Sequence, residues 1–359
     1  MRFFVKYVFV FLLVVSCKSN LIIDYDSEFI VYQGRIGVNS DKKASEIYWS
    51  GSSIKINFTG TEIKVVLEDE NGLNYFNVIL DGKPIEVLKL DKGKQTYTLA
   101  KALVDKKHTI ELTKRNEWTY GKTLFYGFKI TGKALKKDAE KLIFIEYYGD
   151  SITVGHGNED TVSGQDRNDG DVTNNYMSYA AITARRLNAN YSCIARSGIG
   201  VTVSWFNMIM PEMYYRLDPS DTSSKWDFSK KQADIVVVNL FQNDSWIVKQ
   251  PKHEEYIRRF GEETPSETKI IKAYSNFVGK IRAHYPKASI VCLLGNMDIT
   301  KVNSPWPNYV VQAVKSLNDT NIFTCFVPYK NTKKHPRVND HKIIADRLTK
   351  LIETQVLKK

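Results

Sequence analysis

The chain has 359 residues, of which 43% are hydrophobic and 25% are charged, and its formal net charge is +11. This composition is typical of a soluble globular protein, and the length is sufficient for two domains with separate cores. The basic residues are dispersed among acidic ones instead of forming a stripe interleaved with aromatics, so we predict no nucleic-acid binding. The excess charge is expected to be a solvated basic surface, with an anionic polysaccharide or cell envelope as the remaining class of partner.

The first 17 residues have the pattern of an export signal. Arg2 and Lys6 form a positively charged end, and the apolar core Val8–Val15 is too short to span a bilayer as a helix. The core is followed by Ser16-Cys17, which resembles the lipobox of bacterial lipoproteins, where the cysteine is lipidated. We therefore expect an exported protein that a lipid on Cys17 anchors to the membrane of the bacterial cell envelope, at the outer membrane or cell surface. The alternative is an ordinary cleaved signal peptide with an incidental cysteine.

The three remaining cysteines each lie inside an apolar run, at Cys193, Cys292 and Cys325. Thiols in such runs behave as small buried hydrophobic side chains. We predict no disulfide and no metal site, because no cluster of cysteine and histidine has ligand spacing.

The N-terminal half, from about residue 22 to residue 131, contains short segments in which apolar and polar residues alternate. The predicted strands are 54–58, 62–67, 77–80, 96–99 and 108–113. Asp81-Gly82 is a strong hairpin signal, and no convincing helix lies between the strands. The pattern predicts a β-sandwich or jelly-roll domain over residues 18–137, which the charged linker Gly132–Lys141 joins to a second domain over residues 138–359. Trp49, Tyr75 and Trp118 are interpreted as structural aromatics of this half.

The C-terminal half alternates strands with helices. We predict strands at 142–149, 190–195, 233–241, 289–294 and 321–327, with helices at 175–187, 267–285, after Pro305 and at 340–357. This alternation predicts a three-layer α/β domain with a five-stranded parallel sheet. Polar residues gather after the strands, at the sheet edge where such folds bind ligands.

The strand that ends at Gly149 runs into Gly149-Asp150-Ser151, which would place the Ser151 hydroxyl at this edge. Three further blocks follow in order, namely Ser197-Gly198, Asn243-Asp244 and His335-Pro336. In this order the four blocks resemble the SGNH (GDSL-like) hydrolases. The N-terminal half adds Gln33-Gly-Arg-Ile, Asp81-Gly and Phe125-Tyr-Gly-Phe, and the chain as a whole is similar to carbohydrate esterase family 2, whose members pair a jelly-roll domain with an SGNH domain.

Ester hydrolysis needs a nucleophile, a base and donors for the developing oxyanion. Ser151 is the candidate nucleophile and His335 the candidate base, with His341 ranked second and expected to be structural. For the oxyanion hole, the resemblance implies the backbone N–H groups of Ser151 and Gly198 and the side-chain amide of Asn243.

One position departs from the family pattern. The aspartate that usually precedes the catalytic histidine by three residues is Thr332 here. We favour a Ser–His dyad in which a backbone carbonyl or Thr332 orients His335, because the third member must supply orientation and tautomer. Two alternatives remain: an acid displaced to another position, with Asp298 as the first candidate, and a degenerate domain that binds without catalysis.

The aromatic residues Trp246 and Trp306 are the candidates for stacking on a sugar ring, with Trp246 alternatively a core residue. The resemblance implies removal of O-acetyl groups from plant polysaccharides such as xylan or glucomannan, without a metal or organic cofactor. The alternative functions are a glycan-binding surface lipoprotein and an SGNH lipase or thioesterase.

Overall fold

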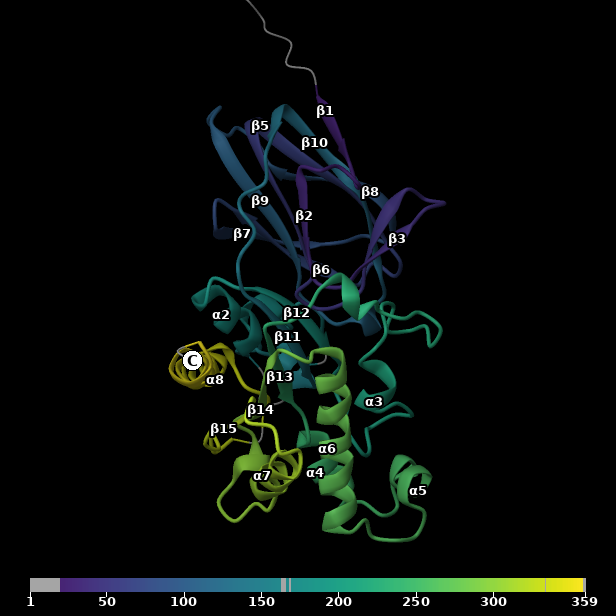
Figure 1. Cartoon of the computed structure of the whole chain (residues 1–359). Coiled ribbons are helices and arrows are strands. Elements are labelled where there is room, and N and C mark those ends of the chain that lie inside the picture. Colours follow the sequence, from purple (N-terminus) through teal and green to yellow (C-terminus); the bar gives the residue numbers. More distant parts are fainter. Residues whose placement is uncertain (1–19, 163–165, 168, 333, 358–359) are drawn as a thin grey trace, which may run out of the picture.

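The computed structural model describes residues 20–162, 166–167, 169–332 and 334–357. Figure 1 shows an N-terminal β domain, drawn in purple and blue, stacked on a C-terminal α/β domain drawn in teal to yellow. The predicted pairing of a β-rich domain with a parallel α/β domain is confirmed. The predicted lipidation residue, Cys17, lies outside the described residues. No helix in the described part of the chain is both long and apolar enough to cross a membrane.

The β domain is built from antiparallel strands around one hydrophobic core. The strands are β1 (Leu21–Asp24), β2 (Ile30–Gln33), β3 (Ile36–Asn39), β4 (Ala44–Ile47), β5 (Ser53–Asp69), β6 (Tyr75–Leu80), β7 (Lys83–Lys89), β8 (Gly93–Ala100), β9 (Lys107–Lys114) and β10 (Thr123–Leu135). A short 3-10 helix, η1 (Trp118–Tyr120), follows β9.

Two sequence predictions for this domain are wrong in detail. The strands expected at 54–58 and 62–67 are the two halves of the single long strand β5. The first half lies between β2 and β9 and the second pairs with β8, so the alternation of side chains is interrupted where the neighbours change. The expected linker also begins later, because β10 continues to Leu135 beside β5.

The α/β domain contains the predicted five-stranded parallel sheet, in the order β12-β11-β13-β14-β15. Its strands are β11 (Phe144–Gly149), β12 (Asn190–Ala195), β13 (Ile235–Asn239), β14 (Ser289–Leu294) and β15 (Ile322–Phe326). The α-helices are α1 (Ser151–Val154), α2 (Tyr179–Arg186), α3 (Met210–Met213), α4 (Gln242–Ile247), α5 (Glu254–Phe260), α6 (Glu267–His284), α7 (Trp306–Ser316) and α8 (Val338–Leu351). Shorter turns of helix are η2 (Asn175–Met177), η3 (Phe228–Lys230), η4 (Asp298–Thr300) and a final π-helical turn, Ile352–Val356.

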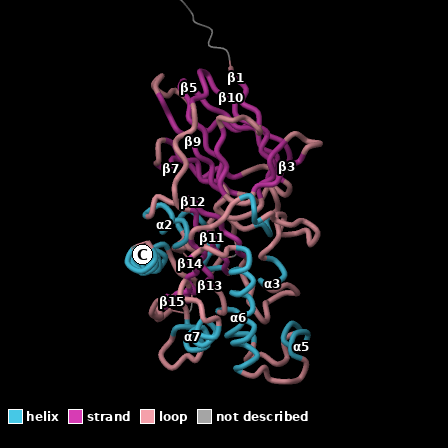
Figure 2. The backbone as a smooth tube through the Cα atoms, viewed as in Figure 1, coloured by secondary structure: helices cyan, strands magenta, loops and turns pink. Residues whose placement is uncertain are grey.

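Helices cover both faces of this sheet, as Figure 2 shows. The buried residues of α6 and α7 share one core with the strands, and those of α2 and α8 share the other. In α6 the buried positions Ile270, Tyr274, Phe277 and Ile281 recur every three or four residues, which places them on one face of the helix. Cys193, Cys292 and Cys325 are buried free thiols, as the sequence predicted.

A buried arginine joins the two domains. Arg35, between β2 and β3, forms a 3.2 Å ion pair with Glu146 of β11, and both side chains are almost inaccessible to solvent. The same guanidinium donates to Tyr148 Oη at 3.0 Å and to the backbone carbonyls of Tyr214 and Arg216. Each of these polar contacts crosses from the β domain to the α/β domain.

Arg35→Met is expected to lower the free energy of unfolding by about 3–5 kcal/mol, because it leaves the Glu146 carboxylate buried without its cation. Guanidinium unfolding measures the change. The control is Lys42→Met, which removes the exposed Lys42–Glu68 ion pair and should cost no more than about 1 kcal/mol. Equal losses of unfolding free energy in the two variants would show that the buried Arg35 contacts stabilise the fold no more than an exposed ion pair.

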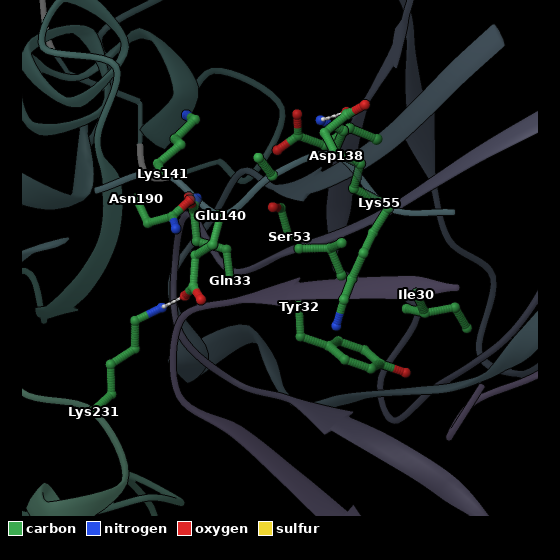
Figure 3. Close-up of a pocket in the computed structure, with 14 residues that line it drawn as sticks. Ile30, Tyr32, Gln33, Ser53, Lys55, Asp138, Glu140, Lys141, Asn190 and Lys231 are labelled. Carbon is green, nitrogen blue, oxygen red and sulfur yellow. Dashed lines mark hydrogen bonds and ion pairs between the residues drawn. The ribbon is translucent and has the colours of Figure 1, made fainter. Parts of the chain in front are cut away.

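A pocket of about 310 Å³ lies where the linker passes the β domain (Figure 3). Lys55 of β5 pairs with Asp138 of the linker at 3.1 Å, and Lys231 pairs with Glu140 at 3.6 Å. The linker is thus held to both domains by ion pairs. Ser151 and the other predicted site residues do not line this pocket.

Candidate active site

Ser151 lies where strand β11 turns into helix α1. The carboxylate of Asp150 caps α1 by accepting the N–H of Ile152 at 3.0 Å. A β-carbon at Gly149 would lie only 1.9 Å from the Thr153 hydroxyl oxygen, so the turn requires glycine. Burial, together with the charge of Asp244, raises the pKa of Asp150 to about 7. The Gly-Asp-Ser segment therefore presents Ser151, 5% exposed, at the carboxyl end of the sheet.

Ser151, His335 and Asp166 form a hydrogen-bonded row. The Nε2 atom of His335 lies 2.8 Å from the Ser151 hydroxyl oxygen, and its Nδ1 atom lies 2.8 Å from a carboxylate oxygen of Asp166. An ionised carboxylate only accepts, so Nδ1 carries the hydrogen and Nε2 is free to accept the serine proton. The sequence placed Ser151 and His335 in one site, and the structure brings them together.

Asp166 comes from the loop between α1 and η2. One carboxylate oxygen also accepts the backbone N–H of His335 at 3.0 Å, and the other lies 2.7 Å from the Arg337 guanidinium. Arg337 in turn donates to the carbonyl of Gly157 at 2.8 Å. Burial alone raises the pKa of Asp166, but the hydrogen bonds from His335 and the Arg337 charge outweigh it and hold the pKa well below its usual range. The carboxylate is therefore ionised beside the imidazole.

The third group at His335 is an acid displaced to another position, as one of our alternatives had it, but it is Asp166 and not Asp298. Asp298 was wrong as the candidate acid, because its carboxylate accepts the Trp246 indole N–H at 3.0 Å and the Gln242 amide at 2.7 Å. Thr332 is exposed, and its hydroxyl contacts the Lys330 ammonium. The favoured dyad is replaced by a row of three residues, with the carboxylate supplied by a different loop. Four other acidic residues lie near Asp166 in that loop, so the sequence alone did not single it out.

The two tryptophans predicted to stack on a sugar ring pack against other side chains of the protein. Trp306 is 4% exposed and packs against Phe241 in the core, so this prediction was wrong. Trp246 is half-buried, packs on the α2–α8 core and donates to Asp298, which is the alternative we had given for it. The tryptophan at the site is instead Trp205, which is 39% exposed and donates its indole N–H to Asn243 at 3.0 Å.

The predicted oxyanion donors lie on three segments that meet beside Ser151. Gly198 has a φ of +83°, which favours glycine, and Asn243 is the second residue of α4, which follows strand β13. The Asn243 amide nitrogen donates to the carbonyl of Ile199 at 2.9 Å and lies 3.5 Å from Asp150. In the described part of the chain, the N–H groups of Ser151 and Gly198 have no hydrogen-bond partner.

Asp244 fixes the loop that follows Gly198, a role that the sequence did not reveal. Its fully buried carboxylate accepts the N–H groups of Val201, Thr202 and Val203 and the Thr202 hydroxyl, at 2.6 to 3.2 Å. The N–H donors come from residues about 40 positions earlier in the chain, so only the fold brings them to Asp244.

Two other histidines lie in this region without reaching Ser151. His341 is fully buried and accepts the backbone N–H of Tyr179 at 3.2 Å, and burial lowers its pKa to about 3. Its predicted structural role is confirmed. The ring of His156 meets His335 edge to face with centroids 4.9 Å apart, and burial with the nearby His335 charge lowers the pKa of His156 to about 4.

Comparison with known proteins identifies the family. The family model described as "Carbohydrate esterase 2 N-terminal" matches residues 32–137 of this chain. The structure of a family two carbohydrate esterase from Clostridium thermocellum, in complex with cellohexaose, is 33% identical, with a TM-score of 0.81, over 91% of this chain and 99% of that one. The chain belongs to carbohydrate esterase family 2. Among solved structures with this fold, the family-two enzyme from Cellvibrio japonicus has a TM-score of 0.82 over 93% of this chain and 98% of that chain, at 23% identity.

Curated relatives of this family member carry esterase names. Cellulase/esterase CelE of Acetivibrio thermocellus is 34% identical over 93% of this chain, which spans 40% of the length of CelE. An acetylxylan esterase / glucomannan deacetylase of Cellvibrio japonicus is 25% identical over 89% of this chain and 87% of its own length. In the described residues, no group of three or more histidine, cysteine, aspartate or glutamate side chains is arranged to hold a metal ion.

Proposed function

We propose that the protein is a serine esterase that removes O-acetyl groups from plant polysaccharides such as xylan or glucomannan. The observation that carries the proposal is the row Ser151–His335–Asp166 at the carboxyl end of a parallel sheet, together with two backbone N–H groups that have no partner among the described residues. Nucleophile, base, orienting group and oxyanion donors are the parts that acyl transfer needs.

In the proposed reaction, the Ser151 oxygen attacks the acetyl carbon while His335 Nε2 takes the hydroxyl proton. The oxyanion that forms is held by the N–H groups of Ser151 and Gly198 and by the second hydrogen of the Asn243 amide nitrogen. His335 then gives the proton to the departing sugar oxygen, leaving an acetyl group on Ser151. Water, deprotonated by His335, releases acetate and restores the serine. Asp166 remains ionised and keeps the hydrogen on Nδ1.

Asn243→Ala is expected to lower kcat by about 10²- to 10³-fold, as removal of one oxyanion donor does in serine hydrolases. Initial rates on nitrophenyl acetate measure the loss. Trp205→Phe is the matched control, because it keeps the Asn243 amide and an aromatic ring but removes the indole N–H that Asn243 accepts, and it should lower kcat less. Near-full activity of Asn243→Ala would contradict a role for its amide.

For the substrate, the proposal draws on the relatives' names and on one exposed aromatic. The Cellvibrio japonicus relative is named for acetylxylan and glucomannan, and the Clostridium thermocellum structure contains cellohexaose. Trp205, partly exposed beside Asn243, offers an aromatic face on which a sugar ring can stack.

The test is release of acetate from acetylated xylan and glucomannan by the purified chain, together with its relative rates on nitrophenyl acetate and butyrate. Release of acetate, with acetate strongly preferred to butyrate, is the expected result. Polysaccharide binding without release would instead favour the glycan-binding alternative. A preference for longer acyl chains would favour a lipase or thioesterase.

We also propose that the protein is exported and lipid-anchored at Cys17, because Ser16-Cys17 follows a short apolar core. Full-length protein expressed in a bacterium with radiolabelled palmitate should incorporate the label, and Cys17→Ala should not. Equal labelling of the two, or none in either, would leave an ordinary signal peptide as the better explanation.

A further inference from the structure

The β domain reaches the loop that carries Gly198. Glu117, in the turn between β9 and η1, is 4% exposed, and its carboxylate accepts the backbone N–H of Ser197 at 2.8 Å. The next residue, Trp118, lies under the guanidinium of Arg196, which is 4.9 Å from the ring centroid. Two consecutive residues of one domain thus contact two consecutive residues of the other.

The turn that carries Glu117 is itself firmly held. The buried ammonium of Lys114 donates to the side-chain oxygen of Asn74 at 2.6 Å and to the backbone carbonyl of Glu117 at 3.2 Å. On the other side, the N–H of Asn175 in the α/β domain donates to the carbonyl of Arg115 at 3.0 Å. The carboxylate therefore projects from a segment that both domains fix in place.

The contact with Ser197 completes the set of bonds around Gly198. The N–H of Arg196 donates to the carbonyl of Gly149 at 3.3 Å, and the carbonyl of Gly198 accepts from Trp205 at 3.1 Å. Because Glu117 holds the N–H of Ser197, the peptide groups on both sides of the Ser197–Gly198 bond are tied down. These bonds restrict the orientation of the Gly198 N–H, which has no hydrogen-bond partner in the described part of the chain.

We propose that Glu117 is a positioning residue for the oxyanion hole, so that the β domain completes the active site of the α/β domain. This inference rests on the proposed function, in which the Gly198 N–H binds the oxyanion. A carboxylate that accepts a backbone N–H makes a charge-assisted hydrogen bond, which is stronger than one between neutral groups. Its loss leaves the Gly198 donor present but free to turn away from the carbonyl oxygen.

The experiment compares kcat and KM for nitrophenyl acetate among four full-length proteins. Glu117→Ala should lower kcat by about 10- to 100-fold, less than deletion of a donor, with little change in KM because the substrate does not touch Glu117. Glu117→Gln keeps an acceptor oxygen and should recover most of the rate. Trp49→Phe is the control, because it removes a different bond between the domains, from the indole N–H to the Leu217 carbonyl at 2.8 Å. Its thermal midpoint should fall while kcat stays that of the wild type.

A Glu117→Ala protein with wild-type kcat would overturn the inference, whatever its thermal midpoint. So would equal losses of kcat in Glu117→Ala and Trp49→Phe, which would indicate a general effect of loosening the interface. If Glu117→Ala does not fold, Glu117→Asp takes its place, because it retracts the carboxylate by one methylene and keeps the charge. An inactive wild-type protein would overturn the proposed function, and this inference with it, whereas an active wild type with unaffected Glu117 variants would overturn the inference alone.

Discussion

Ser151→Ala is expected to abolish acetate release, with kcat lowered by on the order of 10⁴- to 10⁶-fold, as for loss of the nucleophile in other serine hydrolases. The reason is that Ser151 is the hydroxyl within 2.8 Å of His335 Nε2, so its removal leaves the base without a nucleophile to activate. Oxyanion donors remain and supply only the residual rate. Acetate release and polysaccharide binding are to be measured on the same preparations, and binding is expected to survive.

Ser192→Ala is the matched control for this change. Ser192 lies in β12, is 2% exposed and has a hydroxyl with no hydrogen-bond partner among the described residues, so its loss should leave activity unchanged. A serine-reactive phosphonate should label the wild type at Ser151 and spare the Ser151→Ala protein. Substantial acetate release by Ser151→Ala would contradict the serine mechanism. Polysaccharide binding with no acetate release by either the wild type or Ser151→Ala would support a glycan-binding protein on an esterase scaffold.

The site residues that could be predicted from the sequence are those that come soon after a strand in the chain. Ser151 and Asn243 come just after the runs that form β11 and β13, and in a parallel sheet these ends meet at one edge. The fold class followed in the same way, from alternation of period two in the first half and strand–helix alternation in the second. His335 was found by its place in the order of the four blocks, with His341 ranked second.

The parts that could not be predicted depend on where a long loop or another domain lies in space. Asp166 is separated by 169 positions from the histidine it contacts, in a loop with several acidic residues. Arg337, two residues after His335, was the available hint, because a partly buried guanidinium needs a carboxylate partner. Trp306 was mistaken for a ligand-binding aromatic although a helix was predicted after Pro305, because the sequence does not show which face of that helix is buried. It begins α7 and faces the core.

Asp166→Asn is expected to lower kcat by about 10²- to 10⁴-fold, because an amide does not stabilise the imidazolium and allows the wrong tautomer. KM should change little, since Asp166 acts through His335. Two controls carry the same substitution. Asp169→Asn alters an exposed carboxylate of the same loop, and Asp298→Asn alters the acid that the sequence had suggested. Both should keep far more activity than Asp166→Asn, and a comparable loss in Asp298→Asn would restore Asp298 as the acid.

The pH dependence of stability provides a second test of Asp166, with the same Asp166→Asn variant. The pKa of Asp166 is lower in the folded protein than the ordinary aspartate value of 3.8, so the ionised carboxylate stabilises the fold above that value. This contribution is lost as the pH falls through the folded-state pKa, because the proton then binds in both states. The thermal midpoint of the wild type should exceed that of Asp166→Asn at neutral pH, and the gap should close on acidification below about pH 4. A gap that does not change with pH, together with unchanged kcat, would mean that the carboxylate neither pairs with His335 nor orients it, and that the Ser–His dyad is the correct description.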